Sequence, residues 1–131
     1  METTDYVSYP LALALKKAGF DWPCDHYYCA FDNETGMRFW SIHPAQSQNG
    51  LRIPKDTVVA DAPTLAQAQK WLRERKKLHC QVMLNGVRSA YFWRALELVG
   101  NGKCADSVKQ YEVYEDALSD CINAALTIAI R

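Results

Sequence analysis

Apolar residues recur at helical spacing near the start of the chain. Ser8 can accept a hydrogen bond from an amide of the first turn, and Pro10 is tolerated there because those amides have no helical partner. Gly19 is expected to take the left-handed conformation that ends a helix. The pattern predicts a first helix up to residue 18, with a buried stripe of Leu11, Ala14, Leu15 and Ala18.

Two further segments show the same periodicity. Thr64 and Gln67 have the spacing of a capping box, which predicts a helix over residues 65–77. Its inward residues are Leu65, Ala68, Trp71 and Leu72. A last helix is predicted over residues 114–130, and its apolar stripe is wide: Tyr114, Leu118, Cys121, Ala125 and Ile128, with Ile122, Leu126 and Ile130 beside them. Such a helix must be buried in the core or covered by a partner.

Between the helices the pattern changes to strands. Residues 27–31 and 38–42 predict a hairpin, residues 57–60 a short strand, and residues 44–56 the longest loop. Asn85-Gly86 predicts a two-residue type I′ turn, in which Leu84 faces Val87. The strand after this turn is partly apolar on both faces, which favours a central position in its sheet. Residues 108–112 are expected to return as an edge strand.

These elements follow the order α-β-β-α-β-β-(β)-α, which predicts one α+β domain over residues 1–131. We expect an antiparallel sheet of hairpins backed by about three helices. A helix followed by a hairpin occurs twice, over residues 8–43 and 64–99. Phe39-Trp40 and Phe92-Trp93 occupy corresponding strands, which is compatible with a duplicated α-β-β unit.

Composition supports a folded chain without an overall charge preference. Of the 131 residues, 49% are hydrophobic, and 15 basic residues balance 15 acidic ones. The charges are not evenly spread: residues 70–77 contain five basic residues and only Glu74 as an acid, whereas residues 112–120 contain four carboxylates and no base. Whether these segments cancel or form two poles depends on where the fold places them.

Cysteine usage and the first residues favour the cytoplasm. The five cysteines are scattered and include no C-x-x-C pair, so neither a disulfide framework nor a redox centre is indicated. Residues 1–5 lack the basic start and apolar core of a signal peptide, and the longest apolar stretches are shorter than a membrane span. We therefore expect a cytoplasmic protein that makes no membrane contact.

Two kinds of catalytic chemistry find little support. Cys24, His26, Cys29 and His43 are the residue types of a zinc site, but on a strand Cys29 points away from Cys24 and His26, which favours buried thiols and no metal. No nucleophile elbow, zinc-protease motif, phosphate loop or dinucleotide fingerprint occurs. We assign no catalytic residue and no cofactor, and an enzyme without a recognisable motif ranks third among the functions.

Two binding functions remain. The basic residues of the second helix, Lys70, Arg73, Arg75, Lys76 and Lys77, could contact phosphates as a weak nucleic-acid site. The order of elements here is also that of a double-stranded RNA-binding domain, but the last helix begins with Glu115 and Asp116, where lysines are needed. The preferred function is protein binding, in which an unknown partner or a second copy of the chain is held by a face of Ile122, Leu126, Ile128 and Ile130, and nucleic-acid binding is the alternative. Core packing explains the same four residues, and the aromatics could line either a groove or a closed core.

Three stretches carry a family resemblance. They are Gly19 to Tyr28 (GFDWPCDHYY), Ala62 to Glu74 (APT and AQKWLRE), and Tyr111 to Leu118 (YEVYEDAL). In these stretches the chain resembles uncharacterised small proteins of gut Bacteroidetes and their phages or mobile elements. Where that family carries a Ser or Thr cap before the last helix, this chain has Val113. The resemblance implies a bacterial or phage genome and no known activity, so we expect an accessory protein that interacts with other proteins.

Overall fold

The computed structural model describes residues 5–32, 38–44, 58–87, 89–100 and 102–130; for 29–32, 38–44, 58–59 and 129–130 only the backbone is described. In this part of the chain the helices are α1 (Tyr9–Lys17), α2 (Leu65–Trp71), which continues as a π-helical turn over Leu72–Lys76, and α3 (Tyr114–Ile130). The strands are β1 (His26–Asp32), β2 (Arg38–Pro44), β3 (Val58–Asp61), β4 (Leu78–Asn85), β5 (Ala90–Glu97) and β6 (Cys104–Asp106).

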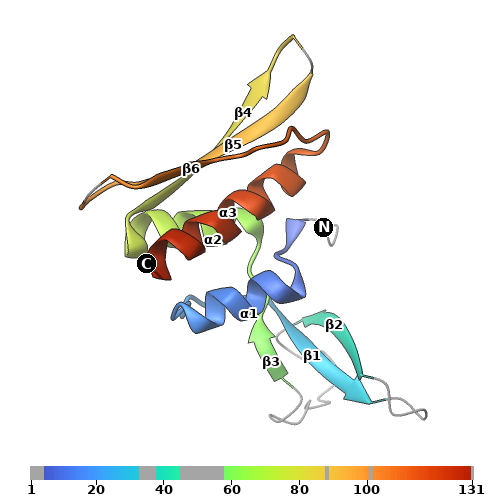
Figure 1. The fold of residues 1–131 in the computed structure, drawn as a ribbon. Helices are drawn as coiled ribbons and strands as arrows, with labels where there is room; N and C mark the ends of the chain where they lie inside the picture. Colours follow the sequence, from blue (N-terminus) through green and yellow to red (C-terminus); the bar gives the residue numbers. More distant parts are fainter. Residues whose placement is uncertain (1–4, 33–37, 45–57, 88, 101, 131) are drawn as a thin grey trace.

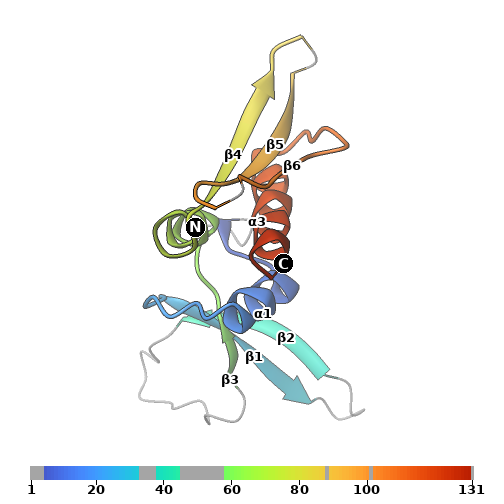
Figure 2. The same cartoon turned by 60° about the vertical axis from the view of Figure 1, so that its left-hand side comes forward.

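The elements form two antiparallel sheets with the helices between them. One sheet has the order β2-β1-β3 and the other has the order β4-β5-β6. Figures 1 and 2 show α1 against the first sheet, α3 and α2 beneath the second, and the β4–β5 hairpin projecting beyond the helices. The predicted α+β class is confirmed, although the strands divide into two sheets where one was expected. None of the described helices combines the length and the apolar character of a membrane span.

Both predicted helix caps are present. The Ser8 hydroxyl accepts a hydrogen bond from the Leu11 amide at 3.4 Å, and the Thr64 hydroxyl accepts one from the Gln67 amide at 3.1 Å. Among the described residues the Gln67 side chain makes no return bond to the Thr64 amide, so the capping box is incomplete; its side-chain amide donates to the Pro23 carbonyl at 2.7 Å. The start of α2 is thereby tied to the segment that leads into β1.

Helix α3 supplies the centre of the core. Its buried residues face β4 and β5 on one side and the helices α1 and α2 on the other. Ile122 and Cys121 are fully buried. Trp93 of β5 is 9% exposed and Trp71 of α2 is 2% exposed. These tryptophans therefore belong to a closed core, not to an open groove. The predicted buried stripe of this helix is confirmed, except that Tyr114 remains 40% exposed.

The β4–β5 hairpin has a different register from the predicted one. Asn85 pairs with Ala90 and Leu84 with Tyr91, so residues 86–89 form the connection instead of Asn85 and Gly86. The Asn85 side chain accepts a hydrogen bond from the Val87 amide at 3.2 Å. Ser89, with φ of 51°, takes the left-handed conformation, which neither Asn85 nor Gly86 adopts. A type I′ turn requires positive φ at both central residues, so the prediction was wrong.

The sheet order also decides two other predictions. β5 lies between β4 and β6, which confirms the central strand. The expected edge strand at residues 108–112 is replaced by β6 at Cys104–Asp106, followed by a single bridge between Tyr91 and Tyr111. The two halves differ in their pairing, because β3 joins the first strand of its hairpin and β6 joins the second. These third strands lie outside the two α-β-β units proposed over residues 8–43 and 64–99, so the duplication stays a prediction.

The burial of α3 can be tested with adjacent residues. Ile122→Ala removes side-chain atoms from a fully enclosed position and should lower the free energy of unfolding by about 2–5 kcal/mol. Asn123→Ala, at the next and exposed position of the same helix, should change it by less than about 0.5 kcal/mol. Urea denaturation followed by circular dichroism measures both values. Equal effects would contradict the placement of the core.

Candidate interaction surface

Among the described strands β4 lies at the edge of its sheet, and the hydrogen bonds of the ladder show which of its backbone groups face outward. The Leu98 amide donates to the Lys77 carbonyl at 2.8 Å, so Lys77 and Leu98 form a hydrogen-bonded pair. This pair lies next to Leu78 and Glu97 and continues the register of the β4–β5 ladder. In an antiparallel ladder such pairs alternate with non-hydrogen-bonded ones. Gln81 and Met83 therefore bond to β5, whereas the amides and carbonyls of Leu78, Cys80, Val82 and Leu84 point away from it.

Only part of this outward edge is covered. Gln69 of α2 donates from its side-chain amide to the Cys80 carbonyl at 2.7 Å, so the helix caps the edge near the start of the strand. Further along, the amides and carbonyls of Val82 and Leu84 have no hydrogen-bond partner among the described residues. We call these four groups the free edge of β4.

The usual protection of an edge strand is missing here. Natural sheets blunt their edges with lysine or other charged residues, proline or a bulge. The strand sequence LHCQVMLN contains no Lys, Arg, Asp, Glu or Pro, and its pairing with β5 runs without a register shift. Leu84 is 60% exposed and Val87, in the following connection, is 95% exposed. The free edge thus offers unpaired backbone groups beside apolar side chains.

The sheet also has one face that no described helix covers. α3 packs against the face that contains Cys80 and Trp93, and Figures 1 and 2 show every helix on that side. The opposite face, which we call the open face, contains the half-buried Met83 and Phe92, which pair directly, together with exposed polar residues. Arg94 donates to Asp106 at 2.5 Å across this face.

The predicted phosphate-contact residues lie on the surface. Lys70, Arg73, Arg75, Lys76 and Lys77 are all exposed. Two of them have intramolecular partners: Lys70 lies 3.8 Å from Glu74, and the Lys76 ammonium lies 5.7 Å from the centre of the Trp71 ring. The Lys70–Glu74 pair is solvent-exposed and therefore weak, whereas the exposed Lys76 ammonium lies over a buried ring.

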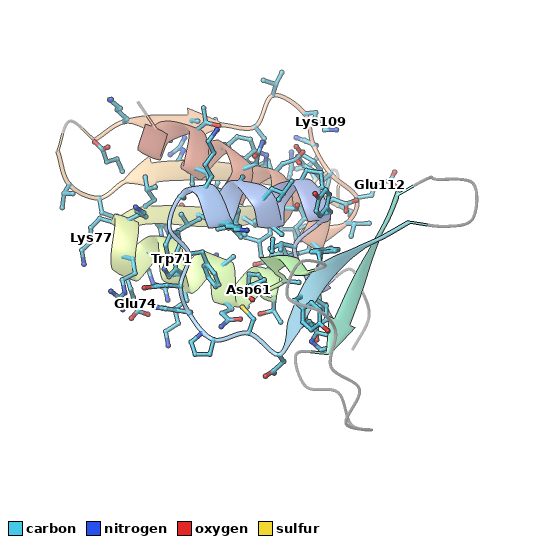
Figure 3. The ribbon with its side chains drawn as sticks, turned by 90° about the horizontal axis from the view of Figure 1, so that it is seen from below. Asp61, Trp71, Glu74, Lys77, Lys109 and Glu112 are labelled. Carbon is cyan, nitrogen blue, oxygen red and sulfur yellow. The ribbon has the colours of Figure 1, made fainter. Side chains whose placement is uncertain are left out.

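The two charged segments of the sequence lie apart in the fold. Figure 3 shows Lys77 and Glu74 at one end of the molecule, and Glu112 at the other. Asp120 at the second end accepts a hydrogen bond from the Tyr111 hydroxyl at 2.5 Å. The zero net charge therefore results from two separated poles, which we call the basic end (residues 70–77) and the acidic end (residues 112–120).

The partner face predicted on α3 is not on the surface. Ile122, Leu126 and Ile128 are 0%, 3% and 7% exposed and pack within the core cluster. Ile130 has a side chain outside the described part of the chain. A face made of the first three residues cannot receive a partner, because the sheet and the other helices already cover them. The core-packing alternative explains these residues.

The thiols and histidines near β1 do not form a metal centre in the described part of the chain. Within it, no group of three His, Cys, Asp or Glu side chains is close enough to hold an ion. Cys24 donates to the Trp22 carbonyl at 3.5 Å, and burial, with Asp61 and Asp25 nearby, raises its pKa to about 12. The His26 ring lies 4.6 Å from the Tyr6 ring. The side chains of Cys29 and His43 lie outside the described residues.

A buried pair of thiols connects the sheet to α3. Cys80 of β4 and Cys121 of α3 are both buried and hydrogen-bonded to each other. The Cys121 thiol also donates to the Arg94 carbonyl at 3.3 Å. The hydrogen bond between the two thiols, together with burial, raises the pKa of Cys80. Both thiols are buried away from solvent, so the pair acts as small apolar residues of the core.

Two of the hollows lined by described residues are candidate ligand sites. One of about 480 Å³ lies between the amino ends of α2 and α3 and is lined by Asp5, Thr64 and Glu115 among others. The other, of about 540 Å³, lies between β6 and α3 beside Cys104 and Ile128. The Thr64 hydroxyl caps α2, and Glu115 lies in the first turn of α3, where it complements the helix dipole. Helix structure accounts for these polar groups without a ligand.

Comparison with known proteins returned no matching family model, no matching curated protein and no matching solved structure.

The sequence contained a signal for the free edge that pattern analysis did not use. Residues 80–87 contain no charged residue, which is unusual for a strand with one exposed edge. If β5 is central, then β4 pairs with β5 on one side and has a free edge on the other unless a further strand pairs with β4. Recognising the edge required the complete sheet order.

The thiol environments predict an order of modification. Iodoacetamide reacts with the thiolate, so the raised pKa should slow alkylation of Cys24 at pH 8 roughly a thousandfold relative to a thiol with the ordinary pKa of 9.0. Its rate should keep rising with pH up to about 12. Of the four described thiols, the exposed Cys104 should react first, and Cys80 and Cys121 only after unfolding. Peptide mass spectrometry of the native protein reads each site. Rapid labelling of Cys24 at pH 8 would contradict this environment.

Proposed function

We propose that this chain is a non-enzymatic interaction protein that binds a partner by accepting a strand at the free edge of β4. The observation that carries the proposal is the pair of residues Val82 and Leu84, whose amides and carbonyls point away from β5 without a partner among the described residues. Strand addition to a sheet edge obtains its affinity from main-chain hydrogen bonds and its specificity from alternate side chains.

The surroundings of the free edge support this mode of binding. The β4–β5 hairpin projects beyond the helices, so an incoming strand meets the sheet without displacing one of them (Figure 1). Leu84 and Val87 provide exposed apolar surface beside the unpaired backbone. The open face, with Met83 and Phe92, would extend across any added strand.

The resemblance to small proteins of gut Bacteroidetes and their phages supports an accessory role in a bacterial or phage genome. The free thiols of Cys24, Cys80, Cys104 and Cys121 suit a reducing compartment, and we place the protein in the cytoplasm. No cofactor enters this proposal. Binding is stoichiometric and requires no catalytic group.

Amide hydrogen exchange tests the free edge. At micromolar protein the Val82 and Leu84 amides should exchange fast, while those of Gln81 and Met83, which bond to β5, stay protected. A synthetic peptide of residues 78–85 with Cys80→Ser, added at millimolar concentration, should protect the Val82 and Leu84 amides. Two-dimensional NMR resolves each amide.

Val82→Pro is the matched control for the exchange experiment. Proline removes an amide that faces outward and leaves the bonds to β5 in place, so the hairpin should stay folded and the peptide should lose its effect. If neither the peptide nor a hundredfold increase in protein concentration protects the Val82 and Leu84 amides, strand addition at β4 is wrong.

The basic end supports a second candidate function, weak binding of nucleic acid. Its five basic side chains are exposed, and Figure 3 shows Lys77 at the opposite end of the molecule from Glu112. Because the poles are separated, a polyanion can approach the basic end without meeting the acidic one. Arg73, Arg75 and Lys77 lie near the end of the helix, where phosphates could reach them. The contacts would be to the backbone of the nucleic acid and independent of its sequence.

Salt dependence tests this second function. If the basic end binds phosphates, retention of duplex RNA or DNA should fall steeply with salt, and Lys77→Ala should reduce the slope of log K against log salt by about 0.9. Lys109→Ala, at the opposite end of the molecule, should leave the slope unchanged (Figure 3). Fluorescence anisotropy with a labelled duplex measures both slopes. Absence of binding at low salt would exclude the function.

A further inference from the structure

We propose that the strand added to β4 is β4 of a second copy, so that the protein forms a two-fold symmetric dimer through a continuous six-stranded sheet. This inference rests on the proposed function, because both use the free edge. The juxtaposition that carries it is the placement of Val82 and Leu84, two residues with outward amides and carbonyls, on either side of Met83.

The free groups are complementary to themselves. If two β4 strands run antiparallel with Met83 opposite Met83 of the second copy, then Val82 of each copy lies opposite Leu84 of the other. Each such pair exchanges two hydrogen bonds, amide to carbonyl in both directions. All four groups of the free edge in each copy are then used. The Cys80 carbonyl keeps its bond from Gln69, because it lies beyond the paired residues.

The side chains match in the same register. Val82 and Leu84 share the face of the sheet on which α3 lies, and in the dimer Leu84 packs beside Val82 of the second copy. Leu84 is 60% exposed in the single chain, so pairing covers apolar surface that is otherwise in water. On the open face, Met83 meets its own copy at the axis, with Phe92 next to it on each side.

The charge pattern favours a second copy over a different protein. A two-fold axis places the residue on the axis opposite its own copy, so a charged residue there would repel itself. From Cys80 to Val87 the chain contains no charged residue. A surface that selects a different partner by electrostatic complementarity carries charge at its contact, and this edge carries none. Neutrality and self-complementary hydrogen bonds together indicate a second copy.

Substitution of Met83 by charged residues of either sign tests this arrangement. The wild-type protein should sediment at about twice 14.9 kDa at tens of micromolar. Met83→Lys and Met83→Glu each place like charges opposite one another at the axis, where facing side chains are closest, and should each weaken dimerisation at least tenfold. An equimolar mixture of the two variants should restore the dimer, because Lys then faces Glu. Recovery in the mixture also shows that both variants are folded.

Gln81→Lys is the matched control. Gln81 lies on the same strand and the same open face, but in the proposed register it faces residue 85 of the second copy instead of its own. This variant should dimerise as the wild-type protein does. If Gln81→Lys is as disruptive as Met83→Lys, or if the mixture of Met83 variants stays monomeric while both are folded, the axis at Met83 is wrong.

A combined result separates this inference from the function on which it rests. A wild-type protein that stays at 14.9 kDa up to hundreds of micromolar overturns the dimer. If the peptide of residues 78–85 still protects the Val82 and Leu84 amides of that monomer, strand addition holds and its natural partner is a different protein. If the peptide gives no protection either, both proposals fail.

Discussion

The arrangement of this protein depends on the burial of α3. The apolar stripe of this seventeen-residue helix is too wide for a sheet alone to cover, although polar positions such as Asp120 and Asn123 stay exposed. The chain meets this constraint by covering α3 with β4 and β5 on one side and with α1 and α2 on the other. The helices thereby become a middle layer, and the strands are left as two separate sheets outside it.

That solution has a consequence for the second sheet. Since α3 covers only one of its faces and α2 reaches only the start of its edge through Gln69, the far part of β4 keeps unpaired backbone groups and an uncovered face. Unpaired edges without charge or proline are a liability for a monomer, which gives the edge a physical reason to be occupied. A dimer would satisfy these groups without any change in the core.

The charged segments illustrate how position changes the meaning of composition. Equal numbers of acids and bases indicate a neutral molecule, yet residues 70–77 close α2 while residues 112–120 open α3, and the two helices place these ends far apart (Figure 3). The basic residues complement the carboxyl end of their helix, and Glu115 and Asp116 complement the amino end of theirs. Helix stability thus explains most of the polarity that a nucleic-acid site would also need.

The sequence by itself determined the local structure: the positions of α1, α2 and α3, the caps at Ser8 of α1 and Thr64 of α2, and the central position of β5. Helical spacing, caps and apolarity on both faces of a strand are properties of neighbouring residues, so the sequence alone reveals them. Tertiary structure alone decided the rest. The β4–β5 register depends on which residue accepts positive φ, and Ser89 does so in place of Asn85 and Gly86. Ile122 looked equally suited to a core or a partner face until the fold buried it. The free edge of β4 arises only from the order of strands, because an unpaired backbone group is defined by the neighbour it lacks.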